Sequence, residues 1–139
     1  MSFFSFRKDE ILRKKKLIDR LFAEGTSFFI YPFKIFWLSV PLESSMPAQI
    51  LIGVSKRSFR HAVDRNRIKR QIRETYRLNK HHLYQHLEKN QRKGVIAIIY
   101  TGNITLTTVE METKIKAVLK RLYAILDKPL DNPAPTLSD

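Results

Sequence analysis

A strongly basic segment that also carries an apolar stripe limits what this chain can fold into. Between Lys56 and Arg77, nine basic residues stand against two acidic ones, a net charge of +7 within a chain total of +13. This stretch holds no Gly or Pro and is dominated by Arg, Lys, Gln, Glu and Ile, which predicts an α-helix from about Ala62 to about Asn79. Such a helix must bury one face and expose the other.

At about 100° per residue, the side chains of that helix fall on two arcs. One arc is mostly apolar and suited to packing on a sheet: Ile68, Ile72, Thr75, Tyr76 and Asn79. The opposite arc is mostly arginine: Asn66, Arg67, Arg70, Arg73 and Arg77. Arginine pairs bidentately with phosphate, and few acids are interleaved to neutralise it, so the arc indicates a polyanionic partner. A merely solvated basic helix is the alternative interpretation.

Composition supports a single basic domain. At 139 residues with 43% hydrophobic residues, the chain suits one domain with a real core. Its pI near 10.2 favours nucleic acid as the partner, with an acidic membrane surface second. No apolar run approaches the ~20 residues of a membrane span, and the N-terminus lacks a signal-peptide pattern, so we expect a cytoplasmic protein with no membrane partner. With no Cys, disulfides and thiolate metal sites are excluded.

The first half of the chain predicts one helix and two strands. Met1 to Glu10 is expected to be a flexible arm. Ile11 to Glu24 repeats apolar residues at helical spacing and predicts a helix. Phe28 to Val40, rich in aromatic and β-branched residues, predicts one long strand with an irregular start at Pro32, and Gln49 to Ser55 predicts a second. Alternation along the long strand places three side chains in the core and leaves three on the other face: Phe33, Ile35 and Trp37 against Lys34, Phe36 and Leu38.

The second half completes an α+β fold. Lys80 to Lys93 is expected to continue the basic helix before a loop, and Val95 to Tyr100 to form a central strand. Thr107 or Thr108 can cap a last helix, with Glu110 placed for a capping box. The order helix, strand, strand, helix, strand, helix predicts a single-domain sandwich of helices on a small central sheet. That domain spans residues 11–126 and is followed by a C-terminal tail over 127–139.

The sequence offers no catalytic or metal site. His81, His82 and His86 lie close together, yet no carboxylate or Cys pattern completes a metal site, so we interpret them as a solvated cluster. Nuclease chemistry requires two or more carboxylates that hold metal ions, or a His pair that acts as acid and base. The acidic residues of this chain are instead scattered singly or in helix-end pairs. We therefore expect binding, not catalysis, from this chain.

Two short motifs in the basic segment match a known signature. Gly53 to Arg57 reads Gly-Val-Ser-Lys-Arg, and Arg65 to Arg70 reads Arg-Asn-Arg-Ile-Lys-Arg, with Ala62-Val63 between them and Ile72-Arg73-Glu74 behind. The run resembles the bacterial ribonuclease P protein component, in which a strand ending in a Val-Ser-Lys-Lys type sequence leads into a helix that opens with Arg-Asn-Arg. The resemblance covers about residues 11–126, with firm motifs only from Gly53 to Arg77.

That resemblance implies both a fold and a function. The fold would be similar to a ribosomal-protein domain, with a left-handed β-α-β crossover through the Arg-Asn-Arg helix, against the usual right-handed preference. The function would be that of a subunit of ribonuclease P, the ribonucleoprotein endonuclease that removes the 5′ leader of precursor tRNA. The RNA subunit would perform the Mg²⁺-dependent hydrolysis, so no cofactor is expected on the protein alone and no protein partner is required. Screening of phosphate repulsion would strengthen docking and metal binding by the RNA.

The resemblance also carries two sets of binding residues over to this chain. The set expected against the catalytic RNA comprises Lys56, Arg57, Arg60, Arg65, Asn66, Arg67, Lys69, Arg70 and Arg73. The set expected in a leader-binding cleft between the sheet and the first helix comprises Ile18, Phe22, Lys34 and Phe36. Stacking on bases there is worth about 1 to 3 kcal/mol per aromatic residue. Phe22 could equally belong to the core, and Ile18 is a departure because an aliphatic side chain cannot stack as an aromatic one does.

One further departure from the family and three alternative functions stay open. Many family members carry Ala-Arg-Pro where this chain has Ile99-Tyr100-Thr101, so Tyr100 either replaces the missing contact by stacking or packs in the fold. A generic RNA-binding or ribosome-associated protein with no processing role is the main alternative. A DNA-binding protein would normally pair its basic helix with a turn-helix partner, and a membrane-surface protein would leave the apolar arc open to lipid.

Overall fold

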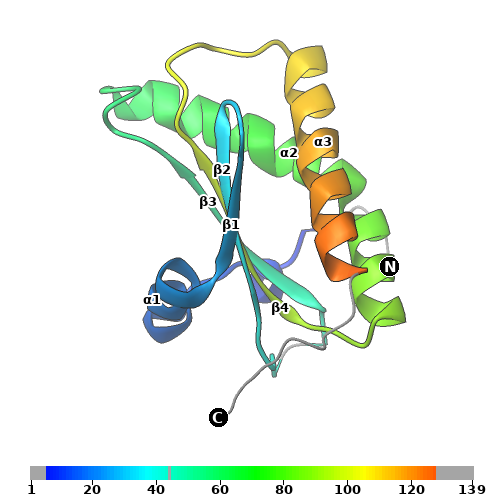
Figure 1. Cartoon of the computed structure of the whole chain (residues 1–139). Helices are drawn as coiled ribbons and strands as arrows, with labels where there is room; N and C mark the ends of the chain where they lie inside the picture. The colour runs from blue at the N-terminus through cyan, green and yellow to red at the C-terminus, as the bar shows by residue number, and fades with distance from the viewer. Residues whose placement is uncertain (1–5, 44, 128–139) are drawn as a thin grey trace.

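The computed structural model describes residues 6–43 and 45–127 (Figure 1). Within these ranges the protein consists of a four-stranded sheet and three α-helices, preceded by one turn of 3-10 helix at Lys8–Glu10. The strands are β1 (Thr26–Ile30), β2 (Phe33–Ser39), β3 (Ala48–Val54) and β4 (Gly94–Tyr100). The helices are α1 (Lys15–Glu24), α2 (Ala62–Lys89) and α3 (Thr108–Leu126). The predicted α+β class is confirmed, and so is the order of helical and strand segments, except that the first predicted strand is divided into β1 and β2.

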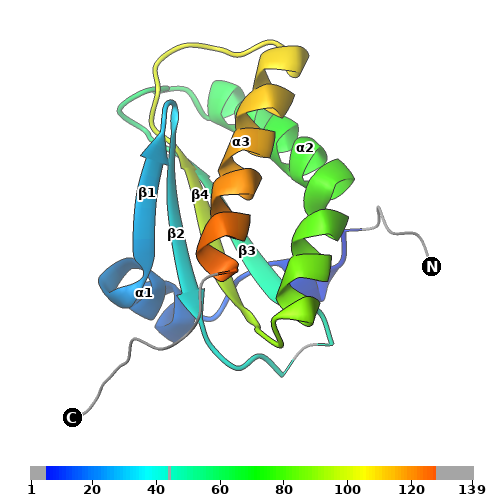
Figure 2. The same ribbon diagram turned by 45° about the vertical axis from the view of Figure 1, so that its right-hand side comes forward.

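The sheet is mixed, with strand order β1-β2-β4-β3 (Figure 2). Strands β1 and β2 pair antiparallel, as do β2 and β4, whereas β3 and β4 run parallel. Parallel neighbours need a crossover connection, and α2 provides it. The left-handed sense of this crossover stays a prediction from the resemblance.

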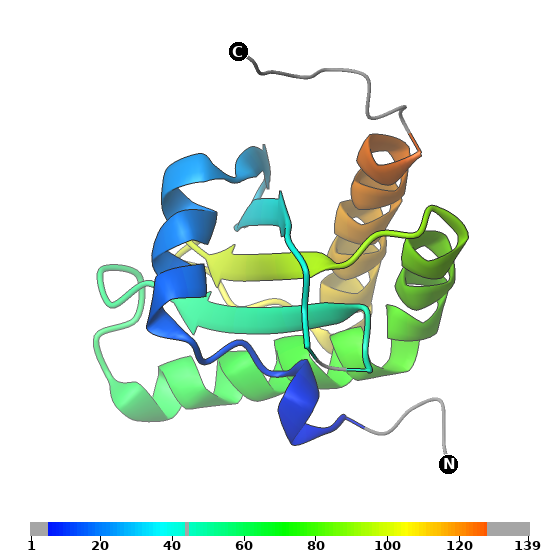
Figure 3. The ribbon, with the colours of Figure 1, turned by 90° about the horizontal axis from the view of Figure 1, so that it is seen from below.

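Helices cover both faces of the sheet (Figure 3). Helices α2 and α3 pack on one face, where the main core includes Phe33, Ile35 and Trp37, the three strand residues predicted to lie inside. Helix α1 packs on the other face over a smaller core: Leu12, Leu21, Val40, Val95 and Ala97. Strand β4 is buried on both faces because it lies between these two cores, as its continuous apolar sequence predicts.

The predicted single strand over Phe28 to Val40 is wrong in one respect, because it is a β-hairpin. Strand β1 ends at Ile30, the chain reverses at Tyr31 and Pro32, and β2 begins at Phe33. Tight hairpin turns usually contain Gly, Asn or Asp, and the turn at Tyr31 and Pro32 contains none of them. The unbroken run of strand-forming residues therefore concealed the reversal.

The N-terminal boundary also differs from the sequence-based expectation. Helix α1 begins at Lys15, not Ile11, because Ile11 bridges to Ile50 and the Leu12 amide donates to the Ile50 carbonyl at 2.9 Å. The predicted arm is anchored over its described part, since Glu10 is fully buried and forms an ion pair with Lys80. Residues 1–5 of that arm, and 128–139 of the predicted tail, lie outside the described residues.

The two long helices follow their sequence signals. Helix α2 continues to Lys89, so its 28 residues span about 42 Å. Its buried residues are the predicted Ile68, Ile72, Thr75 and Tyr76, followed by Lys80, Leu83 and Leu87. Helix α3 is capped by Thr107, whose hydroxyl accepts from the Glu110 amide at 3.1 Å, while the Glu110 carboxylate accepts from the Thr107 amide at 2.9 Å. The predicted capping box is thereby confirmed.

Candidate nucleic-acid interface

The residues expected against the catalytic RNA lie together on one surface. We call this surface the basic face; it comprises the loop after β3 and the first turns of α2. Its side chains are Lys56, Arg57, Arg60, Arg65, Asn66, Arg67, Lys69, Arg70 and Arg73. All of them are exposed except Arg65 and Lys69, which are half-buried. Burial of Ile68 and Ile72 turns the arginine arc outward, as the periodicity predicts.

Arg65 differs from its neighbours because its guanidinium faces the protein. Its Nη1 donates to the carbonyls of Phe59 and Arg60, both at 2.8 Å. These two bonds tie the loop back onto the start of α2, where the helix has no side-chain N-cap. Arg65 is therefore a residue that shapes the basic face from within.

The loop is also attached to the end of β4. The Ser55 amide donates to the Tyr100 carbonyl at 3.0 Å, and the Ser58 hydroxyl donates to the Thr101 carbonyl at 2.9 Å. Tyr100 itself is fully buried, with its ring 6.0 Å from that of Phe59 and its hydroxyl donating to the Ile104 carbonyl. Burial raises the pKa of this phenol. Tyr100 therefore packs in the fold, which settles the alternative that the sequence left open.

The acids near the basic face are held by arginines. Asp64 Oδ1 lies 3.0 Å from Arg67 Nη2, and Glu74 Oε2 lies 2.6 Å from Arg77 Nη2. The hydrogen bond from Arg77 lowers the pKa of Glu74, so this carboxylate stays ionised. Both pairs are exposed, and such pairs are worth at most about 1 kcal/mol, so a phosphate can compete for Arg67.

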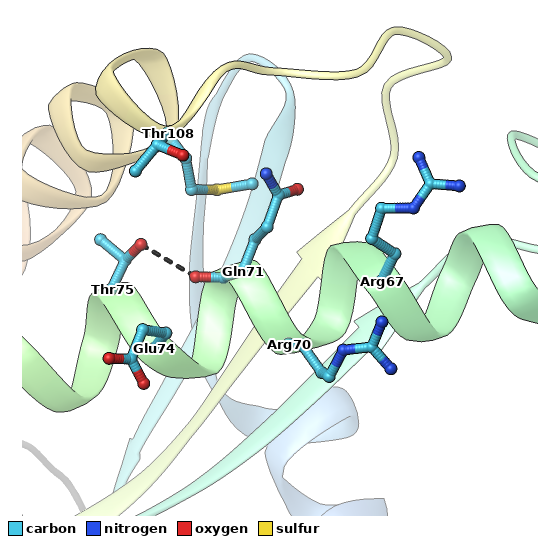
Figure 4. A pocket seen from close by; sticks show the side chains of 7 residues that line it. Arg67, Arg70, Gln71, Glu74, Thr75 and Thr108 are labelled. Carbon is cyan, nitrogen blue, oxygen red and sulfur yellow. Dashed lines mark hydrogen bonds between the residues drawn. The ribbon is translucent and has the colours of Figure 1, made fainter.

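A shallow pocket of about 280 Å³ adjoins the basic face between α2 and α3. Figure 4 shows Arg67 and Arg70, which both extend from α2, beside this pocket. The other residues that line it are Gln71, Glu74, Thr75, Thr108 and Met111. The pocket thus continues the arginine surface toward the start of α3.

The expected leader-binding residues meet on the opposite face of the sheet, beside α1. The ring of Phe22, 42% exposed, lies edge-on to that of Phe36 with centroids 4.7 Å apart. Lys34 Nζ lies 5.4 Å from the centroid of the Phe36 ring. Ile18 is half-buried and packs against the smaller core under α1. The structure therefore brings Phe22, Lys34 and Phe36 together, with Phe22 and Lys34 exposed and Phe36 half-buried, and Phe22 is not a core residue.

Two exposed aromatic residues on the hairpin were missed from the sequence. Phe29 is 52% exposed and Tyr31 is 47% exposed, with ring centroids 6.2 Å apart. The alternation within β1 could have found Phe29, because a buried Phe28 places its neighbour on the other face. Tyr31 could not be placed without knowing that the chain reverses there.

The three histidines lie beside other side chains of α2 and α3. No group of three or more His, Asp or Glu side chains among the described residues is arranged to hold a metal ion. The rings of His81 and His82 lie 4.0 Å apart, and His86 instead stacks on Tyr123 at 4.1 Å.

Within the described ranges, no helix combines the length and apolarity needed to cross a bilayer.

Comparisons with known proteins all lead to one family. A family model described as Ribonuclease P matches residues 6–123. The ribonuclease P protein component of Porphyromonas gingivalis (strain ATCC 33277) is 38% identical over 100 residues, which cover 72% of this chain and 73% of the relative. That of Chlorobium phaeobacteroides is 41% identical over 106 residues, covering 70% and 73%. Sequence similarity therefore extends well beyond the basic segment.

Solved structures show the same fold. The RNase P protein of Staphylococcus aureus matches with a TM-score of 0.64 at 24% identity, covering 81% of this chain and 94% of that one. The RNase P protein of Thermotoga maritima matches with a TM-score of 0.62 at 21% identity, covering 81% and 96%. With a family model that spans most of the sequence and relatives that share it, this chain belongs to the ribonuclease P protein component family, the protein subunits of the enzyme that processes the 5′ end of tRNA.

Proposed function

We propose that the chain binds the catalytic RNA of ribonuclease P through the basic face and leaves hydrolysis to that RNA. The observation that carries this proposal is the concentration of exposed arginines at the start of α2, where Arg70 and Arg73 have no ion-pair partner among the described residues. A folded RNA supplies the phosphates that such a surface needs. The planar guanidinium groups would pair with phosphates bidentately and fix the register of the protein on the RNA.

The positive charge of the basic face should make RNA binding depend on the concentrations of salt and Mg²⁺. Each phosphate that the basic face neutralises releases condensed counterions, so binding weakens as salt rises. Positive charge on the protein also reduces repulsion between the catalytic RNA and the precursor tRNA. Less Mg²⁺ is then needed to bring the two RNAs together.

The residues of the basic face do not fit Mg²⁺ as ligands. Mg²⁺ prefers carboxylate, carbonyl and water oxygens, whereas this surface presents mainly cationic nitrogens. Its nearest carboxylates, Asp64 and Glu74, are paired with Arg67 and Arg77. In our proposal Mg²⁺ belongs to the RNA, where it would activate water and stabilise the departing oxygen. The residues of this chain bind the catalytic RNA and orient the protein on it.

We propose that the leader of precursor tRNA binds beside α1. Phe22 is exposed, Phe36 is half-buried beneath its edge, and the ammonium of Lys34 lies close enough to contact a phosphate on the same strand of RNA. Single-stranded nucleotides bind such surfaces by stacking, with little dependence on base identity. Contact with the leader would make the holoenzyme favour precursor over mature tRNA.

Cleavage of precursor tRNA at low Mg²⁺ tests the proposed function. The catalytic RNA of ribonuclease P is assayed with and without this protein, and the protein alone serves as the control. We expect cleavage by the mixture and none by the protein alone. Failure of the protein to support a cognate RNA would favour the generic RNA-binding alternative, and cleavage by the protein alone would reveal catalytic groups on this chain.

Phe22→Ala is expected to weaken precursor tRNA binding by the holoenzyme about fivefold to tenfold, because it removes one stacking surface. Binding of mature tRNA, which has no leader, should not change. Titration of both tRNAs against assembled holoenzyme measures the difference. Ala23→Ser, on the exposed neighbour of Phe22, is the matched control on the same helix and should leave both affinities unchanged. An equal loss for the two tRNAs would refute leader stacking at Phe22.

A further inference from the structure

A row of four residues crosses the sheet on its α1 side, beyond Phe22 and Phe36. Phe29 pairs with Lys34 across β1 and β2, Lys34 pairs with Ile99 across β2 and β4, and Ile99 pairs with Gly53 across β4 and β3. Paired residues point to the same face of a sheet. The row therefore runs from the hairpin to the strand that leads into the basic face.

Exposed aromatic side chains gather along this row. Among the described residues, the exposed large hydrophobic side chains that are aromatic are Phe22, Phe29 and Tyr31, and all three belong to α1 or the hairpin beside it. Single exposed apolar residues are common on proteins and need no explanation. Here, however, Phe29 lies across from Lys34, which in turn contacts the ring of Phe36. The arrangement alternates aromatic surface with positive charge.

We propose that Phe29, supported edge-on by Tyr31, is a further stacking residue that takes a leader nucleotide beyond those at Phe22 and Phe36. This inference rests on the proposed binding of the leader beside α1. Phe29 and Phe36 are diagonal neighbours across the hairpin, so their Cα atoms are roughly 7–8 Å apart. Adjacent bases of an extended strand could therefore reach the two rings in turn, with their connecting phosphate near Lys34.

Charge identifies the occupant as RNA. An apolar peptide or lipid would gain nothing from Lys34 in the middle of the row. Single-stranded RNA uses both features, because its bases stack on aromatic rings while its phosphates follow positive charge. The other end of the row continues through Gly53 toward Lys56 and Arg57 of the basic face. One continuous surface could thus contact the leader and the catalytic RNA.

Leader length provides the test. Holoenzyme is assembled with wild-type or Phe29→Ala protein, and its affinity is measured for precursor tRNAs whose leaders lengthen by one nucleotide at a time, and for mature tRNA. With wild-type protein, affinity should rise at the nucleotide that reaches Phe29. The variant should lose about tenfold from that length onward and nothing for shorter leaders or mature tRNA.

Matched variants separate stacking from other effects. Phe29→Tyr keeps the ring and should retain the affinity gain, whereas Phe29→Leu keeps apolar bulk without the ring and should lose it. Leu78→Ala, an exposed apolar change on α2, should have no effect at any leader length.

Three outcomes would overturn the inference: no loss for Phe29→Ala at any leader length, an equal loss for mature tRNA, or full affinity for Phe29→Leu. Phe22→Ala tests the proposed cleft independently, because a selective loss there together with a neutral Phe29→Ala would refute only the extension to Phe29. A neutral Phe22→Ala would instead refute leader stacking beside α1.

Discussion

Glu10→Ala is expected to lower the free energy of unfolding by about 3 to 5 kcal/mol. Glu10 is fully buried and its carboxylate accepts from Lys80 Nζ and from the hydroxyl of Tyr84. Lys80 is almost fully buried too, with its ammonium also near the ring of Phe6 at 5.3 Å. Removing the carboxylate leaves that positive charge in the interior without its counterion. Urea denaturation followed by circular dichroism measures the loss.

Two control variants show whether the loss of stability in Glu10→Ala comes from the buried charge. Asp19→Ala removes an ion pair of the same type, with Lys15 at 3.3 Å, but from the surface, and should change stability by less than about 1 kcal/mol. Glu10→Leu combined with Lys80→Met removes both charges and should recover much of the loss, because no unpaired charge then remains inside. A loss below about 1 kcal/mol for Glu10→Ala would mean that the pair does not anchor the N-terminal segment.

The buried pair also matters for function through the position of α1. Glu10 immediately precedes Ile11 and Leu12, which pair with Ile50 at the edge of the sheet before the chain enters α1. The pair thus fixes where α1 begins, and α1 carries Phe22 to the ring of Phe36. The pair of Glu10 and Lys80, which are 70 residues apart in the sequence, therefore supports the surface proposed for the leader.

The spacing of apolar residues correctly predicted which side chains of α2 and β2 are buried and which are exposed. The apolar arc of α2 is buried because Ile68, Ile72 and Tyr76 recur at helical spacing, and the arginine arc is exposed for the same reason. Strand alternation correctly separated Ile35 and Trp37 from Lys34 and Phe36. The binding residues taken from the resemblance lie on two surfaces that match these patterns, although their contacts with RNA remain predictions.

What the sequence could not predict depends on contacts that residue type and spacing do not reveal. Nothing near Glu10 indicates that its partner is Lys80, so a buried glutamate was assigned to a flexible arm. Arg65 looks like any other member of the arginine-rich segment, yet the carbonyls of Phe59 and Arg60 bind its guanidinium. The hairpin was missed because its turn lacks the residues that usually mark one. Of the three, only the Glu10–Lys80 pair joins residues far apart in the sequence, whereas Arg65 and the hairpin turn make local contacts.

Replacing Arg67, Arg70 and Arg73 together by Gln is expected to weaken binding to the catalytic RNA by about 100-fold to 1,000-fold at about 0.1 M salt. Each phosphate that the variant no longer neutralises should reduce the slope of log affinity against log salt by about 0.7 to 0.9, so three such phosphates reduce it by about 2 to 3. The fold should survive, because all three side chains are exposed and, within residues 6–43 and 45–127, Arg67 alone of the three has an ion pair, on the surface. Filter binding across a salt series measures both quantities.

The same change of net charge elsewhere on the molecule distinguishes a specific surface from general attraction. Replacing Lys114, Lys116 and Lys120 on α3 by Gln also removes three positive charges, yet it should leave affinity within about threefold of wild type. If both triple variants weakened binding equally, net charge alone would account for the affinity and the chain would be a generic RNA binder. If only the α2 variant weakens binding and flattens the salt dependence, the phosphates of the catalytic RNA lie against the start of α2.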